Sequence, residues 1–478
     1  MYDRISRMMA QSKQAEFSLA GHFQGIFVDQ GRFSLRDYLL MHVLLALGLG
    51  LLYESFAVAV ICILSSLFLL LFYRPNAHRL DALMLASFVA IAAVVWIYAG
   101  NVEMYNNGYY LGGSDDLIFE NYARYTIECD MYTMADINAR TAFETFDYKG
   151  FLMLLAWFMR FCNLFGGYHT ICFRVINVHL WLAVALMISC HYRKRFPQNE
   201  RTSRRIFLLT ALFPNALYIS GHVFRDTIGI FLIVFMYVKW DIFFKKKCTW
   251  PHRIWIALYT LPIMYIAYWV RNFNFFLILV IIGFSFIFME VDNKKRHHLI
   301  SLLLVLAVLP ILLTRFDLLY MLKKFYTRYS DKLLEANPGM SQVIFSVPLL
   351  PFGIFLRIAF GLIMPAPIWI FAPFLRSFSQ NAVIESIVSA GTIVQIYGLP
   401  YILASFRPMK KMAATFLFTL LIIVVTTFTF RHFITIYPFM IPLLLHGVET
   451  VPYEKRRSFF ITQSIFLGLI LLFYALGR

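Results

Sequence analysis

Residues 112–124 read GGSDDLIFENYAR, and this stretch places two adjacent carboxylates, Asp115 and Asp116, directly after a glycine pair. It lies within the polar segment 100–148, which interrupts long blocks of nearly unbroken hydrophobic sequence. Like charges at contact distance repel, so the pair requires a metal ion, a basic ligand, a nearby arginine or a proton retained on one carboxyl group. A solvated pair of loop acids is the alternative. The topology of the flanking hydrophobic blocks decides where these acids lie.

The hydrophobic blocks predict the fold class. Of the 478 residues, 60% are hydrophobic and 14% are charged, whereas about a quarter of the residues in an average soluble domain are charged. Apolar blocks of about 20 residues, long enough to cross a hydrocarbon core, recur along the whole chain. We therefore expect an all-α, polytopic transmembrane bundle of about 11–13 spans embedded in a lipid bilayer.

The net charge of +17 indicates a membrane orientation and not a nucleic-acid partner. The basic residues cluster in short loops between hydrophobic blocks, such as 74–79, 192–205 and 294–298. Because lysine and arginine accumulate in cytoplasmic loops, these loops are expected inside the cell. The six cysteines form no CxxC pair, so we expect neither a disulfide framework nor a zinc site.

This orientation divides the chain into two parts. Residues 1–35 are expected to form a cytoplasmic or interfacial arm, and residues 36–478 a single transmembrane domain whose external loop, 100–168, carries the acidic stretch. The proline-rich stretch 346–376 is expected to hold a short hairpin or a re-entrant pair. The other predicted spans are 38–54, 56–73, 80–99, 170–190, 206–219, 223–239, 254–270, 273–289, 299–314, 382–404, 412–430, 433–447 and 459–476.

The segment 150–165 is apolar but is not counted as a span. It contains Arg160 near its middle, and an arginine at the bilayer centre costs about 2.5–3.5 kcal/mol on insertion scales. If both this segment and 170–190 crossed the membrane, the strongly basic loop 192–205 would lie outside. We therefore expect 150–165 to be an external helix lying along the membrane surface.

The resulting topology places a group of charged residues on the same external face as Asp115 and Asp116. For any single arginine, snorkelling to water at the end of a span is the alternative. Asp226 could likewise form a structural ion pair with Arg225 or Arg271. Arginine binds phosphate through its planar fork, so the group together indicates an anionic substrate, such as a lipid phosphate, at the outer interface. Its members are His222, Arg225, Asp226, Arg271, Arg315, Arg431 and His432.

The same residue types suit glycosyl transfer from a phosphate-linked donor. That reaction needs a carboxylate base to deprotonate the acceptor hydroxyl and cations to stabilise the phosphate leaving group. Asp115 is the candidate base, or it shares a metal with Asp116. Ligation by oxygen atoms alone, together with phosphate, favours Mg²⁺ or Mn²⁺ as the cofactor.

Residues 80–240 resemble the membrane glycosyltransferases of the GT-C fold, which use polyprenyl-phosphate-linked sugars. In that family an acidic pair opens the first external loop, as Asp115 and Asp116 do here, and a surface helix ending in a glycine turn follows, as at 148–167. An arginine then heads the next span, as Arg174 does. A proline, a small residue and an arginine precede an aspartate at a later span start, similar to the order Pro214, Ser220, Gly221, Arg225 and Asp226.

The resemblance also has departures. Asp116 stands where many members have glutamate, and Tyr148-Lys149-Gly150 stands where a Pro-Pro element is usual. Later in the chain, Arg431 and His432 before Pro438 are similar to the family's basic residue beside late prolines.

The resemblance and the charge pattern predict a glycosyltransferase of the bacterial inner membrane, with its active site facing the periplasm. It would move a sugar from a polyprenyl-phosphate donor to a glycan, lipid or protein acceptor. Asp115, Asp116 and Asp226 are the predicted catalytic residues. The predicted substrate-binding residues are His222, Arg225, Arg271, Arg431, His432 and Arg174, although Arg174 could instead tether the external loop. The alternatives are a surface-polysaccharide polymerase or ligase, a lipid-linked glycan flippase, and a noncatalytic assembly subunit.

Overall fold

The computed structural model describes residues 33–75, 77–110, 115–143, 149–246, 248–289, 346–364, 379–426 and 430–476, with the single residues 327 and 344. Throughout these residues the secondary structure is helical, without a strand, which confirms the predicted all-α class for the described part. The predicted span 299–314, Arg315, residues 1–32 of the arm and residues 112–114 of the acidic stretch lie outside the described residues.

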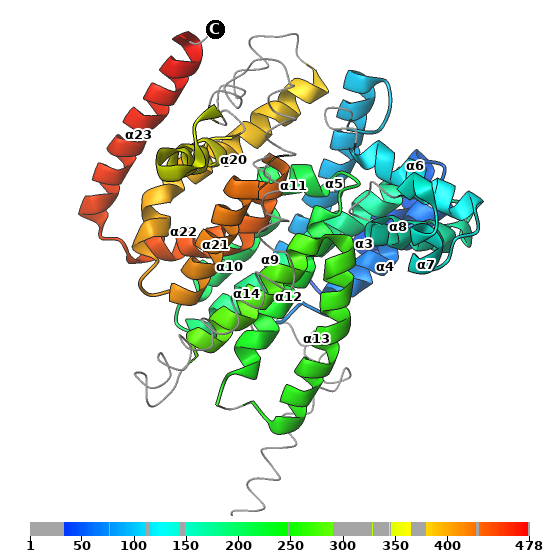
Figure 1. The fold of residues 1–478 in the computed structure, drawn as a ribbon, viewed down its shortest axis with the longest axis horizontal. Helices are drawn as coiled ribbons and strands as arrows, with labels where there is room; N and C mark the ends of the chain where they lie inside the picture. Colours follow the sequence, from blue (N-terminus) through cyan, green and yellow to red (C-terminus); the bar gives the residue numbers. More distant parts are fainter. Residues whose placement is uncertain are drawn as a thin grey trace, which may run out of the picture.

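Figure 1 shows the order of the helices along the bundle. Their bounds are α3 (Leu35–Leu52), α4 (Phe56–Leu70), α5 (Leu80–Tyr105), α6 (Asp115–Glu128), α7 (Met134–Asn138), α8 (Lys149–Asn163), α9 (Thr170–Arg195), α10 (Glu200–Ala211), α11 (Pro214–Ser220), α12 (Asp226–Phe243), α13 (Trp250–Val270), α14 (Asn272–Ile287), α18 (Ile354–Leu362), α20 (Gln380–Ala404), α21 (Lys410–Thr426), α22 (Tyr437–Thr450) and α23 (Tyr453–Leu476). Three short turns of other helical types are η1 (Thr141–Phe143), η2 (Leu349–Gly353) and η4 (Phe430–Ile436).

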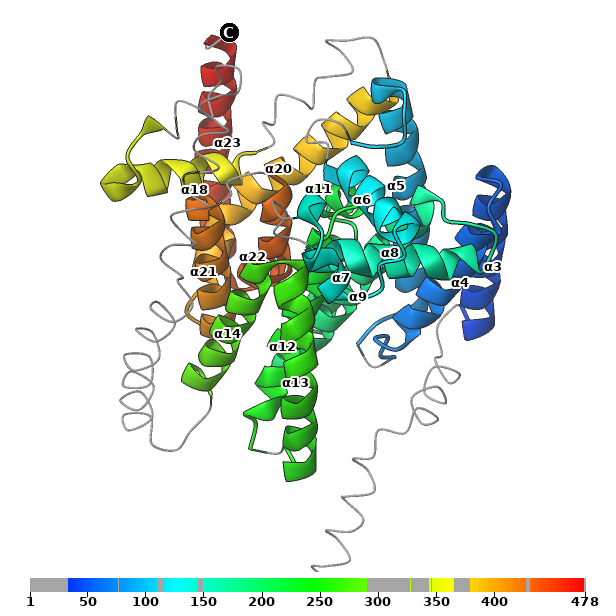
Figure 2. The ribbon, with the colours of Figure 1, turned by 45° about the vertical axis from the view of Figure 1, so that its right-hand side comes forward.

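Helix α9 forms the centre of the bundle. It packs against α4, α5, α10 and α12, and 89% of the residues in its most apolar stretch are buried. Figures 1 and 2 show it between α3 and α4 on one side and α20 to α22 on the other. The indole of Trp181 on this helix donates to the carbonyl of Thr210 at 2.8 Å. A helix that is apolar on all sides is expected in such a core position.

The outer helices carry the surface that lipid would cover. Only 28% of the apolar stretch of α3 and 22% of that of α13 are buried, and leucines such as Leu44 and Leu51 are exposed on α3. Six helices in the described residues are long and apolar enough to cross a membrane: α3, α5, α9, α13, α20, and η4 with α22. The protein is therefore an integral membrane protein, while the full count of 11–13 spans stays a prediction.

One predicted span is wrong as a continuous helix. Residues 206–219 are divided between α10 and α11, and the break falls at Leu212 and Phe213. Pro214 lacks an N–H and occupies the first position of α11, where no intrahelical donor is needed. Phe213 before it is extended, at φ −64° and ψ 116°, because the proline ring disfavours a helical preceding residue.

Helices α6, α7 and α8 form a small layer at one side of the bundle, on the right in Figure 1. Helix α6 packs along α8, with the rings of Phe119 and Phe151 5.0 Å apart. The predicted helix at 150–165 is present as α8, and the chain turns after it at Gly166 and Gly167, whose φ values of +94° and +117° favour glycine. This layer places the start of α6 beside the turns between later helices.

Arg160 of α8 is bonded inside this layer through one of its guanidinium nitrogens. Its Nη2 donates to the carbonyl of Met131 at 2.9 Å, and its guanidinium lies 4.0 Å from the ring centroid of Tyr132. The side chain therefore anchors α8 to the loop that follows α6. The position of α8 along a membrane surface stays a prediction.

Candidate functional site

Arg431 joins two carboxylates from distant parts of the chain. Its Nη1 lies 2.5 Å from Oδ2 of Asp115, and its Nε lies 3.1 Å from Oδ2 of Asp226. Asp115 begins α6, Asp226 begins α12, and Arg431 lies on η4. The guanidinium also lies 4.5 Å from the ring centroid of Phe224. The structure thus brings together three predicted site residues that sequence places in separate loops.

Arg271 adds a second guanidinium to Asp226. It is the extended residue between α13 and α14, at φ −168° and ψ 120°, and its Nη1 lies 3.0 Å from Oδ1 of Asp226. Nε2 of His432 lies 3.9 Å from the same oxygen. Because the Asp226 side chain is only 1% exposed, its two oxygens face the two arginines and not solvent. Asp226 is therefore the residue that holds the two guanidinium groups in place.

Arg225 lies beside this group. Its Nη1 donates to the carbonyl of Val270, next to Arg271, at 3.4 Å, and its guanidinium lies 5.9 Å from the ring centroid of Phe119 on α6. Because a guanidinium stays protonated in proteins, Arg225 carries its charge at neutral pH.

The described side chains of this group carry more positive than negative charges. Arg225, Arg271 and Arg431 contribute three positive charges, and Asp115 and Asp226 contribute two negative charges. The guanidinium groups have five N–H donors each in a planar fork, which can bond two oxygens of a phosphate at once. Among these described side chains three guanidinium groups face two carboxylates, a ratio that suits an anion. We call these five residues, with His432, the arginine cluster.

Asp116 faces a different arginine from Asp115. Its Oδ2 lies 3.7 Å from Nη2 of Arg174, and both side chains are fully buried. The backbone N–H groups of Tyr110 and Leu117 donate to its carboxylate, each at 3.0 Å. Burial raises the pKa of Asp116 to about 6, although Arg174 acts in the opposite direction. The adjacent acids are thus separated, and each has its own guanidinium.

Arg174 connects two loops. Besides Asp116, it donates to the carbonyl of Gly221 at 3.0 Å and to the carbonyl of Gly108. Because both acceptors are backbone groups, these bonds tie the segment after α5 to the turn before α12. This geometry matches a tether more closely than a substrate-binding residue.

His222 is buried behind the arginine cluster. Its Nδ1 lies 2.7 Å from the carbonyl of Tyr218, and its ring stacks on Phe224 with centroids 5.2 Å apart. Burial lowers its pKa to about 3, so the ring is neutral at physiological pH. It supports the turn that leads to Arg225, and it makes no ion pair with the cluster among the described residues.

Two residues of this region escaped the sequence analysis. Nδ2 of Asn177, on α9, donates to the carbonyls of His222 and Phe224, each at 2.9 Å, and so fixes the turn before Arg225. Glu120 is fully buried and accepts from the hydroxyls of Tyr109 at 2.5 Å and Tyr168 at 2.6 Å. The spacing of Glu120 four residues after Asp116 on one helix face was the available signal.

The predicted metal site does not have a matching donor set. In the part of the chain that the structure describes, no group of three or more His, Cys, Asp or Glu side chains is arranged to hold a metal. Asp115 and Asp116 face different arginines, and the positive charges around Asp115 oppose a dication. A Mg²⁺ or Mn²⁺ site at these residues therefore stays a prediction, and no step below depends on it.

Three comparisons with known proteins were made. No family model matches the chain, and no curated protein or solved structure matches it.

Proposed function

We propose that this protein is a membrane glycosyltransferase that uses a polyprenyl-phosphate-linked sugar. The observation that carries the proposal is the contact of Arg431 with both Asp115 and Asp226, with Arg271 on the second oxygen of Asp226. A carboxylate base beside an excess of arginine charge is what transfer from a phosphate-linked donor requires. The apolar outer helices would let a lipid donor reach this group sideways from the bilayer.

In this proposal the exposure of each carboxylate side chain indicates its role. Asp115 is the more accessible carboxylate, with 40% of its side chain exposed, so it is the candidate general base. Asp226 is 1% exposed and orients Arg271 and Arg431. Together with Arg225, these two arginines would bind the phosphate, with His432 beside them. Asp116, tied to Arg174, would fix the start of α6 and so the position of Asp115.

The proposed reaction balances as follows. The Asp115 carboxylate accepts the proton of the acceptor hydroxyl, and the oxygen attacks the anomeric carbon of the donor sugar. The bond between that carbon and the phosphate oxygen breaks, and its electron pair leaves with the polyprenyl phosphate. The arginines stabilise the negative charge that develops on the phosphate. Arg431 would exchange its contact with Asp115 for one with phosphate as the donor binds.

The proposed location follows from the loop charges. The basic loops 74–79 and 192–205 would face the cytoplasm, and the arginine cluster would then lie on the periplasmic side of a bacterial inner membrane. The acceptor there would be a growing glycan, a lipid or a protein.

A polysaccharide polymerase or ligase that uses arginines without a metal is the second candidate. The pairing of both cluster carboxylates with guanidinium groups favours it, since Asp115 would then only position Arg431. The Asp115→Asn variant separates the two, because an amide still accepts a hydrogen bond from Arg431 but is not a base. Retained transfer would support the second candidate.

The test is incubation of the purified full-length protein in lipid nanodiscs with labelled polyprenyl-phosphate sugars. Wild type is expected to release or transfer the sugar, and Asp115→Asn is expected to lose this activity. The matched control is Asp130→Asn, the same chemical change at an exposed position, where φ of 52° suits asparagine. Translocation of the intact lipid in vesicles without covalent change would instead indicate a flippase.

A further inference from the structure

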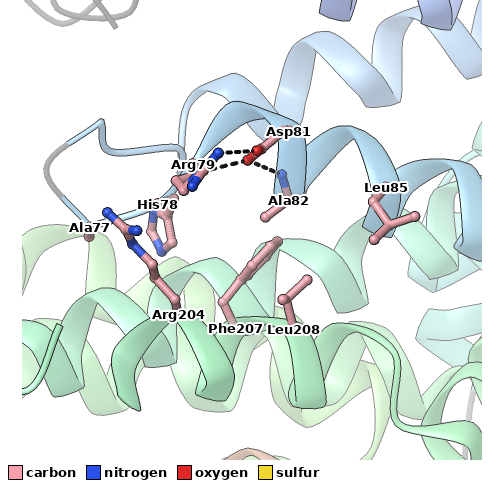
Figure 3. A pocket seen from close by; sticks show the side chains of 9 residues that line it. All are labelled: Ala77, His78, Arg79, Asp81, Ala82, Leu85, Arg204, Phe207 and Leu208. Atoms are coloured by element: carbon pink, nitrogen blue, oxygen red, sulfur yellow. Dashed lines mark hydrogen bonds and ion pairs between the residues drawn. The ribbon is translucent and has the colours of Figure 1, made fainter. Parts of the chain in front are cut away.

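A second charged feature lies far from the arginine cluster, in a pocket of about 370 Å³ between the start of α5 and α10. Figure 3 shows Arg79 and Arg204 at one side of this pocket, with His78 between them and Phe207 below. The residues that line it are Ala77, His78, Arg79, Asp81, Ala82, Leu85, Arg204, Phe207 and Leu208. The pocket therefore combines an apolar floor with a basic edge.

The apolar floor continues onto the outer surface of the bundle. Leu85 lines the pocket and is 52% exposed, and Phe88 on the same helix is 49% exposed. Both belong to α5, one of the helices long and apolar enough to cross a membrane. An acyl chain following this face would pass from the pocket into the bilayer.

The two arginines at the basic edge are only partly neutralised by neighbouring carboxylates. Arg79 bonds to Asp81 through Nε at 3.1 Å and Nη2 at 2.5 Å, and its side chain is 49% exposed. Arg204 shares Glu200 with Arg193, so one carboxylate serves two guanidinium groups. An excess of positive charge thus remains beside Arg204, whose side chain is 42% exposed.

His78 does not add to this charge. Its Nε2 lies 2.8 Å from Oγ of Ser189 on α9, and its Nδ1 accepts from the N–H of Arg74 at 3.2 Å. Burial lowers its pKa to about 3, so it is neutral at physiological pH. The recognition of an anion would rest on the two arginines alone.

The pocket lies at the N-terminal end of α5. Leu80 begins this helix, which is long and apolar enough to cross a membrane, so a lipid headgroup is expected at the level of the two arginines. The arginine cluster lies beyond the other end of α5, where Tyr110 bonds Asp116. A helix of 26 residues is ~39 Å long, so the two basic sites would face opposite sides of a membrane that α5 crosses.

We propose that this pocket binds an anionic phospholipid from the leaflet opposite the arginine cluster. Its headgroup phosphate would contact Arg79 and Arg204, and one acyl chain would lie over Leu85 and Phe88. A basic edge above an apolar floor at the membrane interface complements a phospholipid, whereas a free phosphate would use only the edge. The inference does not depend on the proposed glycosyl transfer.

The experiment is native mass spectrometry of the full-length protein titrated with phosphatidylglycerol or phosphatidylcholine. Wild type is expected to bind phosphatidylglycerol preferentially. The double variant Arg79→Gln/Arg204→Gln is expected to bind it about 30-fold more weakly, from roughly 1 kcal/mol for each arginine removed. The matched control is Arg201→Gln/Arg205→Gln, which removes the same charge from exposed positions of α10 outside the pocket lining.

A second variant tests the apolar floor. Ala82→Trp fills the pocket while both arginines remain, so it is expected to weaken phosphatidylglycerol binding as well. Equal binding by the pocket variants and wild type would overturn the proposal, as would an equal loss in the control variant. A third outcome would overturn the proposal too. If inorganic phosphate displaced phosphatidylglycerol and Ala82→Trp bound phosphatidylglycerol as wild type does, the ligand would be a free anion and not a lipid.

Discussion

Arg431 lies 2.5 Å from Asp115 although 316 positions of sequence separate the two residues. The same guanidinium reaches Asp226, so Arg431, late in the chain, meets carboxylates from two earlier helices. The contact links the 3-10 turn η4 to the starts of α6 and α12. The proposed chemistry depends on this link.

Substitution of Arg431 by glutamine is expected to lower the catalytic efficiency with a polyprenyl-phosphate sugar by roughly 10²–10³-fold. This is the usual effect of removing one hydrogen-bond donor that stabilises the negative charge of a transition state. Arg431→Lys should not restore it, because an ammonium cannot bind two partners through a planar fork. Donor titration in nanodiscs measures both variants. Near-wild-type efficiency in Arg431→Gln would exclude this residue from the reaction.

Substitution of Asp226 by asparagine is expected to destabilise the protein by about 3–5 kcal/mol, because it removes the buried charge between Arg271 and Arg431. Asp115→Asn should cost much less, since that side chain is 40% exposed. Thermal unfolding of the two variants in the same detergent makes the comparison. Equal stability of both would show that Asp226 does not hold the cluster together.

The pKa of Asp116 predicts a pH dependence of stability. Burial raises this pKa from 3.8 to about 6, so between about pH 4 and 6 the folded state holds the proton more tightly than the unfolded state. The resulting stabilisation is complete below pH 4 and is lost as the pH rises through 6. Relative to Asp116→Asn, wild type should therefore become less stable from pH 4 to 6 and change little above pH 7. Unfolding series at matched pH values test this, and an opposite slope would contradict it.

Glu120 is expected to stabilise the α6 layer through its two tyrosines. Replacement by leucine removes a buried acceptor for the hydroxyls of Tyr109 and Tyr168, and each stranded hydroxyl costs about 1–3 kcal/mol. The additional replacement of Tyr168 by phenylalanine should then cost little. A double-mutant cycle measures this coupling, and strict additivity would show that the contact contributes nothing.

Local patterns in the sequence predicted much of the fold. The apolar blocks predicted α3, α5, α9, α13 and α20, because the length that crosses a hydrocarbon core is visible in sequence. The break at Pro214 was missed although proline carries a clear signal, since the surrounding run is apolar enough to suggest one span.

The candidate site was less predictable. The loop charges indicated that Asp115, Asp226 and Arg431 share a face, but no local pattern shows which arginine meets which carboxylate. Asp115 and Asp116 were treated as a pair, yet adjacent residues on a helix point in directions about 100° apart. Asn177 acts through backbone carbonyls of a distant turn, and a contact of this kind leaves no trace in sequence.

The most direct test of the proposed site is a structure of the protein with a polyprenyl-phosphate sugar bound. The account predicts the donor phosphate within hydrogen-bond distance of Arg271 and Arg431, with the sugar beside Asp115. A donor phosphate held elsewhere, for example at Arg79 and Arg204 on the opposite face, would contradict it.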